Sequence, residues 1–192
     1  QSRVSILCAF CVALGAYSWM YLDWLPNGYG QIGYDYAYFL PQLLDGWYWA
    51  STNGVLSVPW FTPSFCGGIP AFANPQNVYF SAPQLLTLLL DPLAALQVNF
   101  ILFGGIAFWG MYLCCHAAFD CSRPASILAA TIFLFNGFFV SRYLMGHLTF
   151  HVFALLPWVA YFALRTLAEI QPCRRLQYWT DCSAIGLLVA YM

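Results

Sequence analysis

Residues 93–119 read LAALQVNFILFGGIAFWGMYLCCHAAF, a run of 27 residues without a charged side chain. A helix needs about 20 predominantly apolar residues to cross a hydrocarbon core of about 30 Å. The run is therefore long enough to cross a bilayer with some tilt. Apolar segments in the core of soluble proteins are usually shorter, so this stretch predicts a transmembrane helix and decides the fold class.

Other apolar stretches lie on both sides of this run. They predict further membrane helices at about 4–22, 125–143 and 148–166, and the start of a fifth at 183–192. The last stretch has ten residues, too few to cross a bilayer, so we interpret the chain as the N-terminal part of a larger protein. Residues 1–192 are thus predicted to form part of an all-α integral-membrane bundle with several spans.

The composition agrees with a membrane location. Hydrophobic residues make up 62% of the chain and charged residues 7%, against about 25% charged residues in a soluble domain. Six arginines, no lysine and seven acids give a net charge of −1, which excludes the basic surface that binds nucleic acid. The partner that this composition predicts is the lipid bilayer.

The arginines predict the orientation of the spans, because cytoplasmic loops carry an excess of positive charge. With the N-terminus in the cytoplasm, five of the six arginines lie on the cytoplasmic side, namely Arg3, Arg123, Arg165, Arg174 and Arg175. Arg142 is the exception and lies outside. This bias predicts a multi-pass protein of the cytoplasmic (inner) membrane with residues 23–92 in an external loop.

The predicted external loop, residues 23–92, has an unusual composition. It holds eight of the eleven prolines, together with many tryptophans, tyrosines and phenylalanines. A disordered linker is polar and poor in aromatic residues, so we expect an ordered loop on the membrane surface that carries short interfacial helices. Residues 35–50 predict one amphipathic helix and residues 74–90 a second short one. The lipid-facing residues of the first are expected to be Phe39, Leu43, Leu44, Trp47 and Tyr48.

Four aspartates of this loop have no arginine or lysine within the loop to pair with. A carboxylate near an apolar interface is costly unless it is paired, hydrogen-bonded or bound to a cation. Asp23 directly follows the first span, Asp45-Gly46 predicts a helix end, and Asp91-Pro92 predicts a cap before the second span. Asp35 is either an N-cap or part of a shaped site.

Polar residues gather again between the third and fourth predicted spans. Arg142 either extends to lipid phosphates at the membrane surface or binds a phosphate within a cavity, because its guanidinium matches phosphate oxygens. His147 and His151 are four residues apart, which places them on one face of a helix. That spacing suits a metal, but two histidines do not make a ligand set, so we assign no metal ligands.

The order of several short motifs resembles one family of membrane proteins. An external aspartate lies in Gly33-Tyr34-Asp35-Tyr36-Ala37-Tyr38-Phe39-Leu40-Pro41. The later motifs are Leu44-Asp45-Gly46, Pro59-Trp60, Gly67-Gly68-Ile69-Pro70, Asn74-Pro75-Gln76, Gly146-His147 and Pro157-Trp158. This order resembles the N-terminal half of the GT-C superfamily of integral-membrane glycosyltransferases, and especially its YfhO-like bacterial branch.

The resemblance implies an enzyme of the cell envelope that moves a sugar from a polyprenyl-phosphate donor to an acceptor at the outer face of the membrane. In that superfamily an acid of the first external loop is catalytic or binds a metal, which maps to Asp35 here. We therefore expect Asp35 to be the catalytic residue, and Arg142, His147 and Asp45 to bind substrate or phosphate. A divalent cation is the one cofactor that the resemblance leaves open.

The sequence is also compatible with two other kinds of function. A transporter or an accessory channel subunit has interrupted helices inside the membrane, whereas most of the prolines here lie in the loop at 23–92. A non-catalytic assembly protein would keep the same architecture without the chemistry. The downstream sequence would separate these functions from the transferase.

Overall fold

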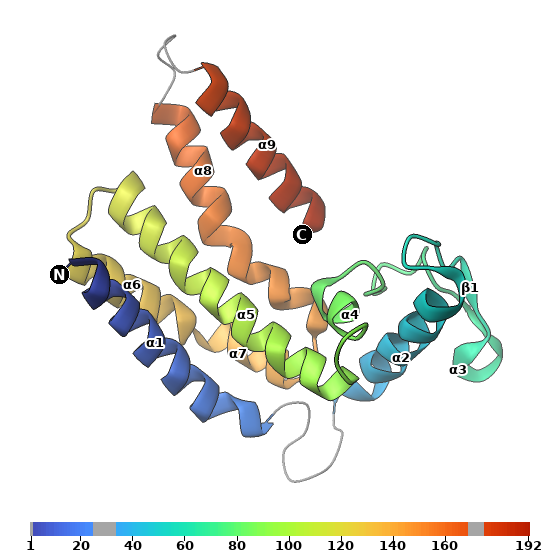
Figure 1. Ribbon diagram of the computed structural model, residues 1–192. Coiled ribbons are helices and arrows are strands. Elements are labelled where there is room, and N and C mark those ends of the chain that lie inside the picture. The colour runs from blue at the N-terminus through green and yellow to red at the C-terminus, as the bar shows by residue number, and fades with distance from the viewer. Residues whose placement is uncertain (1, 25–33, 169–174) are drawn as a thin grey trace. The chain divides into compact units, whose positions relative to one another are not determined.

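A computed structural model describes residues 2–24, 34–168 and 175–192 (Figure 1). The described chain is mostly helical. Its elements are α1 (Ser2–Tyr21), η1 (Leu22–Trp24), α2 (Tyr36–Asn53), β1 (Phe61–Thr62), α3 (Ser64–Gly67), β2 (Ile69–Pro70), α4 (Ala82–Leu86), α5 (Pro92–Leu113), η2 (Cys114–Ala118), α6 (Arg123–Leu134), α7 (Gly137–Leu144), η3 (Leu148–Leu155), α8 (Leu156–Ala168) and α9 (Arg175–Tyr191).

The chain forms two compact units. We call residues 1–20, 101–140 and 151–192 the helical unit, and residues 21–100 and 141–150 the loop unit. The loop unit holds all four aspartates of the predicted external loop, together with Arg142 and His147.

Four segments form helices that are long and apolar enough to cross a membrane. They are Val4–Tyr21, Pro92–Ala118, Arg123–Leu144 and Leu148–Leu167. Each begins and ends within two residues of a span predicted from the sequence. The four spans are therefore confirmed as apolar helices of sufficient length.

The third of these segments consists of two helices rather than the single one predicted. α6 ends at Leu134 and α7 begins at Gly137. Asn136 satisfies the backbone at the break, because its Oδ1 accepts from the Phe139 backbone N at 2.8 Å and its Nδ2 donates to the Phe133 carbonyl. A short polar side chain that bonds nearby backbone competes with the helix, which accounts for the break.

Glycines and aromatic rings meet where α5 contacts its neighbours in the helical unit. A Cβ at Gly104 would lie 2.9 Å from the Tyr17 ring of α1, and a Cβ at Gly110 would overlap the indole of Trp158 in α8. Trp158 also donates from Nε1 to the Ile106 carbonyl at 2.8 Å. Small residues let membrane helices approach closely, so these positions bring α5 against α1 and α8.

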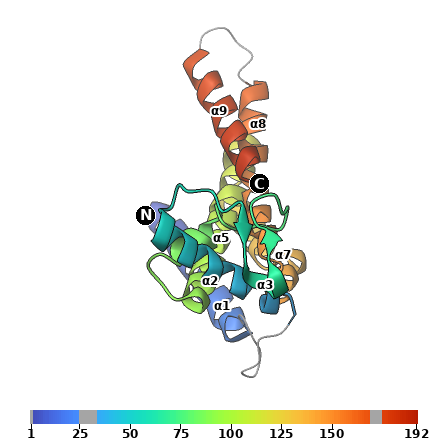
Figure 2. The same cartoon turned by 90° about the vertical axis from the view of Figure 1, so that its right-hand side faces the viewer.

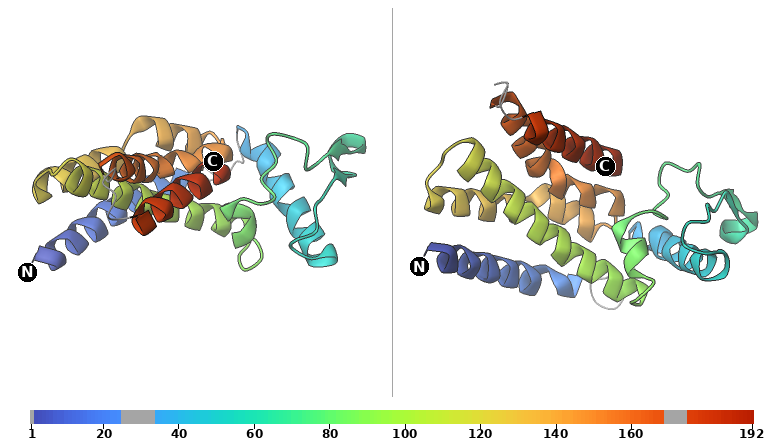
Figure 3. Two further views of the ribbon diagram at one scale, coloured as in Figure 1. Left: turned by 90° about the horizontal axis from the view of Figure 1, so that it is seen from above. Right: turned by 45° about the horizontal axis from the view of Figure 1, so that its top comes forward.

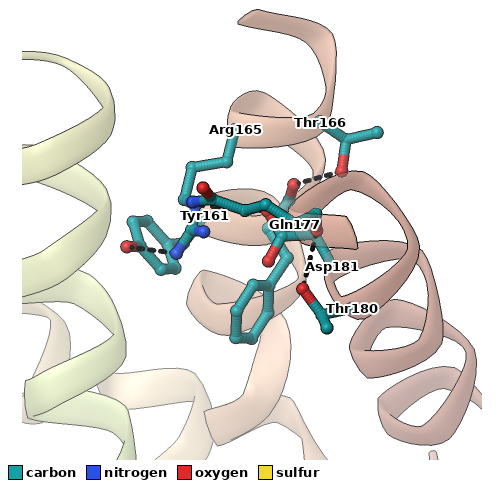
Figure 4. Close-up of polar contacts among 7 residues, drawn as sticks. Tyr161, Arg165, Thr166, Gln177, Thr180 and Asp181 are labelled. Carbon is teal, nitrogen blue, oxygen red and sulfur yellow. Dashed lines mark hydrogen bonds and ion pairs between the residues drawn. The ribbon is translucent and has the colours of Figure 1, made fainter. Parts of the chain in front are cut away.

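α8 and α9 lie side by side and antiparallel in every view (Figure 1, Figure 2 and Figure 3). Arg165 of α8 and Asp181 of α9 form an ion pair, with 3.2 Å between Nε and Oδ2, and Arg165 also donates to the Tyr161 hydroxyl (Figure 4). α9 begins at Arg175 and not at 183, where the apolar run predicted it to start. α9 can contain the buried carboxylate of Asp181 because the guanidinium of Arg165 pairs with it.

In the loop unit, α2 packs against α4 through Gly46. The side chain of Gln84 occupies the space that a Cβ on Gly46 would take, and its Nε2 donates to the Leu43 carbonyl at 3.1 Å. The prediction of a helix end at Asp45-Gly46 is therefore wrong, and α2 continues to Asn53. The missing side chain of Gly46 permits a close approach and does not end the helix.

Helices lie within both segments in which the sequence predicted them, α2 at Tyr36–Asn53 and the short α4 at Ala82–Leu86; their location at a membrane surface stays a prediction. The apolar residues of α2 divide between two faces: Phe39 and Leu43 are buried in the loop unit, whereas Leu44, Trp47 and Tyr48 are exposed. Phe39 and Leu43 were predicted to face lipid, and the structure uses them as core residues instead. α2 thus has one apolar face in the core of the loop unit and a second group of apolar side chains that is exposed.

Between α2 and α4 the chain forms a small antiparallel hairpin, with Phe61 opposite Pro70 and Thr62 opposite Ile69. Gly68 adopts a φ of +101°, where a Cβ would also overlap the Phe61 ring. Glycine tolerates both constraints. The hairpin lies beside α2 (Figure 2), and it carries Thr62 toward that helix.

Candidate functional site

Asp35 and His147, which are 112 residues apart in the sequence, are in contact in the loop unit. Their side chains approach to 2.8 Å between Oδ2 and Nε2. The Asp35 side chain is 54% exposed and that of His147 is 26% exposed. The contact therefore lies at the surface of the unit, where a ligand has access to the carboxylate.

Arg142 contacts the other nitrogen of the same histidine. Its Nη1 lies 3.3 Å from His147 Nδ1, and its guanidinium lies over the Phe150 ring at 5.3 Å. Arginine carries only donors, so Nδ1 accepts this hydrogen bond. In this arrangement Nε2 carries the ring hydrogen and donates to Asp35. We call these three residues the Asp35 cluster.

The backbone around Gly146 holds this cluster in place. The Asp35 backbone N donates to the Met145 carbonyl at 3.1 Å. Gly146 adopts a φ of +85°, and a Cβ there would lie 2.5 Å from the backbone N of Tyr36. The turn before His147 thus packs directly against the first residue of α2, which brings the histidine to Asp35.

Two buried tyrosines anchor the same turn. Tyr36 donates from its hydroxyl to the Tyr143 carbonyl, and Tyr143 donates from its own hydroxyl to the Leu96 carbonyl at 3.1 Å. Asn99 donates to the Tyr143 hydroxyl at 2.7 Å. Burial and then the neighbouring Tyr143 raise the pKa of Tyr36 well above its usual value, so Tyr36 stays protonated and able to donate at neutral pH.

Asp35 occupies the N-cap position of α2, one of the two alternatives predicted from the sequence. Its side chain makes no capping hydrogen bond, and its backbone has helical angles of −74° and −7°. A capping aspartate accepts from the backbone of the first turn. Here the carboxylate contacts His147 instead. Asp35 therefore lies at the start of α2 without using its side chain to cap the helix.

An open groove with a volume of about 1060 Å³ runs along α2. Asp35 and Asp45 both line it, together with the aromatic residues Tyr34, Tyr38, Tyr48, Trp49 and Phe65. Arg142 and His147 are not among its lining residues. Asp35 is therefore the residue that connects the groove to the two basic side chains.

Asp45 lies apart from the Asp35 cluster. It follows Asp35 by ten residues on the same helix, which is a rise of about 15 Å. Its Oδ1 accepts from the Thr62 hydroxyl at 2.8 Å and from the Ser64 hydroxyl at 2.8 Å. The structure thus does not bring Asp45, for which the sequence predicts a substrate-binding role, into the cluster of Asp35, Arg142 and His147.

The remaining polar residues singled out in the sequence have other partners. Asp91 caps α5 as predicted, because its Oδ1 accepts from the backbone N of Leu93 and of Ala94 at 3.0 and 3.1 Å. His151 is buried in the helical unit, where its Nε2 contacts the Tyr191 hydroxyl at 2.9 Å. Within residues 2–24, 34–168 and 175–192, no three His, Cys, Asp or Glu residues form a group that would hold a metal ion.

Sequence analysis missed the residues that support the cluster. Tyr36 lies in the motif around Asp35 and Tyr143 among the polar residues near Arg142, but no local pattern predicts their hydrogen bonds, and Asn99 reads as an ordinary residue of an apolar helix. Gly146 gave a usable signal, because a glycine directly before a polar residue is typical of a turn with positive φ.

Comparisons of the chain with protein-family models, with curated proteins and with solved structures find no match.

Proposed function

We propose that this chain carries the catalytic aspartate of a membrane glycosyltransferase of the GT-C type. The donor is a sugar linked to a polyprenyl phosphate, and the reaction takes place at the outer face of the cytoplasmic membrane. The observation that carries the proposal is the position of Asp35, whose half-exposed carboxylate lines an open groove and contacts His147. The four apolar helices and the arginine distribution support a membrane protein with residues 23–92 on the external side.

The reaction needs a base at the acceptor. The acceptor hydroxyl forms a bond to C1 of the sugar as the bond from C1 to the phosphate oxygen breaks, and the bonding electrons leave with the phosphate. The hydroxyl proton passes to the Asp35 carboxylate. A positioned carboxylate contributes about 10² to 10⁴ in rate to such a step. Phosphate is a competent leaving group, so this step needs no second carboxylic acid of the kind used in glycoside hydrolysis.

Arg142 supplies the positive charge of this proposed site, and His147 lies beside it. The guanidinium matches two phosphate oxygens at once, and it is held between Phe150 and His147 rather than extended freely. Donors fixed where negative charge develops stabilise the transition state. Arg142 is also the single arginine or lysine in the sequence of the loop unit, so no other residue of this unit offers a permanent positive charge to a phosphate.

The test is transfer activity of the full-length protein that contains this chain, reconstituted in liposomes with cell-envelope membranes as the acceptor source. Polyprenyl-phosphate glucose, galactose and mannose serve as donors, and release of polyprenyl phosphate is measured. We expect Asp35→Asn to lower the rate by about 10² to 10⁴, because it keeps the shape of the side chain and removes the base. Asp23→Asn, a change to an exposed aspartate directly after α1, is the matched control.

Three results would contradict the proposal. Wild-type protein that releases no polyprenyl phosphate from any donor would indicate an assembly protein. Wild-type protein that moves the intact donor across the bilayer would indicate a transporter. Equal rates for wild type and Asp35→Asn would remove Asp35 from the reaction.

A further inference from the structure

We infer that the groove along α2 binds a neutral saccharide of more than one ring, and that this saccharide is the acceptor. The inference rests on the proposed function for the identity of the reaction. It goes beyond that function in naming the chemical class of the second substrate and the residues that hold it. Its support comes from the hydrogen-bonding groups, the aromatic rings and the charge of the groove.

The Asp45 end of the groove offers hydrogen-bond acceptors. Thr62 and Ser64 each donate their one hydroxyl hydrogen to Asp45 Oδ1. A hydroxyl has a single hydrogen and two lone pairs. Thr62 is buried and its Oγ1 already accepts from the Ser64 backbone N at 3.2 Å, so the Ser64 oxygen and the Asp45 carboxylate are the acceptors left for a ligand. A ligand that binds beside them must bring donors, as the hydroxyl groups of a sugar do.

Two of the aromatic rings in the groove are held by hydrogen bonds. Trp49 donates from Nε1 to the Ser57 carbonyl at 3.0 Å, and the Tyr38 hydroxyl accepts from Asn74 Nδ2 at 2.9 Å. Tyr48, one turn of α2 from Asp45, is 65% exposed. Apolar faces with a few placed polar groups are typical of small-ligand sites, and a sugar ring presents an apolar C–H face beside its hydroxyls. Rings already fixed lose little freedom on binding.

The charge of the groove argues against an anionic ligand. Its ionisable acids are Asp35 and Asp45, and no arginine or lysine lines it. Two carboxylates repel a phosphate, a nucleotide or an acidic peptide. The lipid phosphate of the donor is therefore expected at Arg142, outside the groove, and a neutral ligand within it.

The length of the groove sets the size of the ligand. Asp35 and Asp45 are separated by a rise of about 15 Å along α2, which is longer than a single sugar ring. A saccharide whose terminal hydroxyl meets Asp35 would place a later ring beside Asp45 and Tyr48. Binding is thus expected to strengthen from a monosaccharide to a short oligosaccharide.

The experiment measures binding of neutral saccharides to the purified full-length protein in detergent micelles by saturation-transfer NMR and titration. The probes are glucose, galactose and mannose and their oligomers of up to four units, with spermidine as a cationic probe. We expect an oligosaccharide to bind wild type, and Tyr48→Ala to weaken it by about three- to tenfold. Trp47→Ala is the matched control, because Trp47 is an exposed aromatic of the same helix that lines a different depression.

The outcomes separate this inference from the proposed function. Asp35→Asn should keep oligosaccharide binding while transfer is lost, and Asp45→Asn should weaken binding while it leaves the donor KM unchanged. Absence of saccharide binding to wild type, or equal weakening by Tyr48→Ala and Trp47→Ala, would overturn the inference even if transfer depends on Asp35. Tighter binding of spermidine than of every saccharide would identify a cation site instead and would also overturn it.

Discussion

Two carboxylates of this chain each contact a basic side chain, but in opposite surroundings. Asp35 of the loop unit contacts His147 with 54% of its side-chain surface exposed, whereas Asp181 of the helical unit contacts Arg165 with 4% exposed. The contact distances are similar, 2.8 Å and 3.2 Å. Access to solvent, rather than distance, is what distinguishes the two pairs.

This difference in exposure predicts different roles for the two pairs. An exposed hydrogen bond or ion pair contributes about 1 kcal/mol or less to stability because water competes for both groups, yet its carboxylate is open to a ligand. In a buried pair, the loss of one partner leaves a charge uncompensated at a cost of about 3–5 kcal/mol. We therefore expect Asp35 to matter for activity and Asp181 for the packing of α8 against α9.

The largest effect on stability is expected for Asp181→Ala, which removes the buried carboxylate and leaves Arg165 without it. The Arg165 side chain is 26% exposed and also bonds Tyr161, so part of its charge is compensated. We expect a loss of about 2–3 kcal/mol, below the range for a fully buried pair. The midpoint of thermal unfolding of the full-length protein in micelles measures it, with Asp23→Ala as the exposed control.

A second substitution shows whether the charge itself is responsible. The double variant Arg165→Met with Asp181→Leu replaces the ion pair by apolar side chains, a change that is often neutral or stabilising. We expect it to recover most of the stability that Asp181→Ala loses. If the double variant unfolds at the same temperature as Asp181→Ala, the loss comes from packing and the comparison between the two pairs fails.

The next effect concerns the backbone that positions the exposed pair. Gly146→Ala would force a side chain onto a residue with a φ of +85° and against the backbone N of Tyr36. Strain at such a position costs about 1–3 kcal/mol, and relief of the strain would move His147 away from Asp35. We expect about 2 kcal/mol of lost stability together with lower transfer activity. Gly137→Ala, where a Cβ meets nothing within 4 Å, is the control and should leave activity unchanged.

The sequence was sufficient to predict the membrane helices and the members of the Asp35 cluster. Each span is a local property, because about 20 predominantly apolar residues already predict a helix long enough to cross a bilayer. Asp35, Arg142 and His147 were conspicuous because charged and polar side chains are rare in so apolar a chain. Their contact was not predictable, because it depends on the turn at Gly146 and on Tyr143, more than 100 residues after α2 begins.

The errors have a common physical origin in contacts between distant residues. Gly46 looked like a helix end, but its role depends on Gln84, which occupies the space beside it. The apolar run predicted a helix start at 183, whereas α9 also contains Asp181, whose charge is paired with Arg165 of α8. A local sequence pattern does not contain the distant residue that a side chain contacts, and in both cases that contact determines the structure.

A smaller effect is expected for Tyr36→Phe, which removes the hydrogen bond to the Tyr143 carbonyl and keeps the ring. The loss should be about 1 kcal/mol. Because the pKa of Tyr36 is raised on folding, its contribution is complete below the usual tyrosine pKa of about 10 and is lost as the pH rises through the folded value. Thermal unfolding at pH 7 and above pH 10 checks both statements. Tyr48→Phe, at an exposed position of α2, should behave as wild type.

The smallest effect on stability is expected for the exposed pair itself. Asp35→Asn, His147→Gln and the double variant form a cycle that isolates the interaction between the two side chains. Because the Asp35 side chain is 54% exposed, we expect a coupling free energy below about 1 kcal/mol, although each single variant loses transfer activity. Thermal unfolding in micelles and polyprenyl-phosphate release are measured on the same preparations. A coupling as large as that of Arg165 with Asp181 would make the Asp35 contact structural, and the contrast between an open and a buried carboxylate would no longer hold.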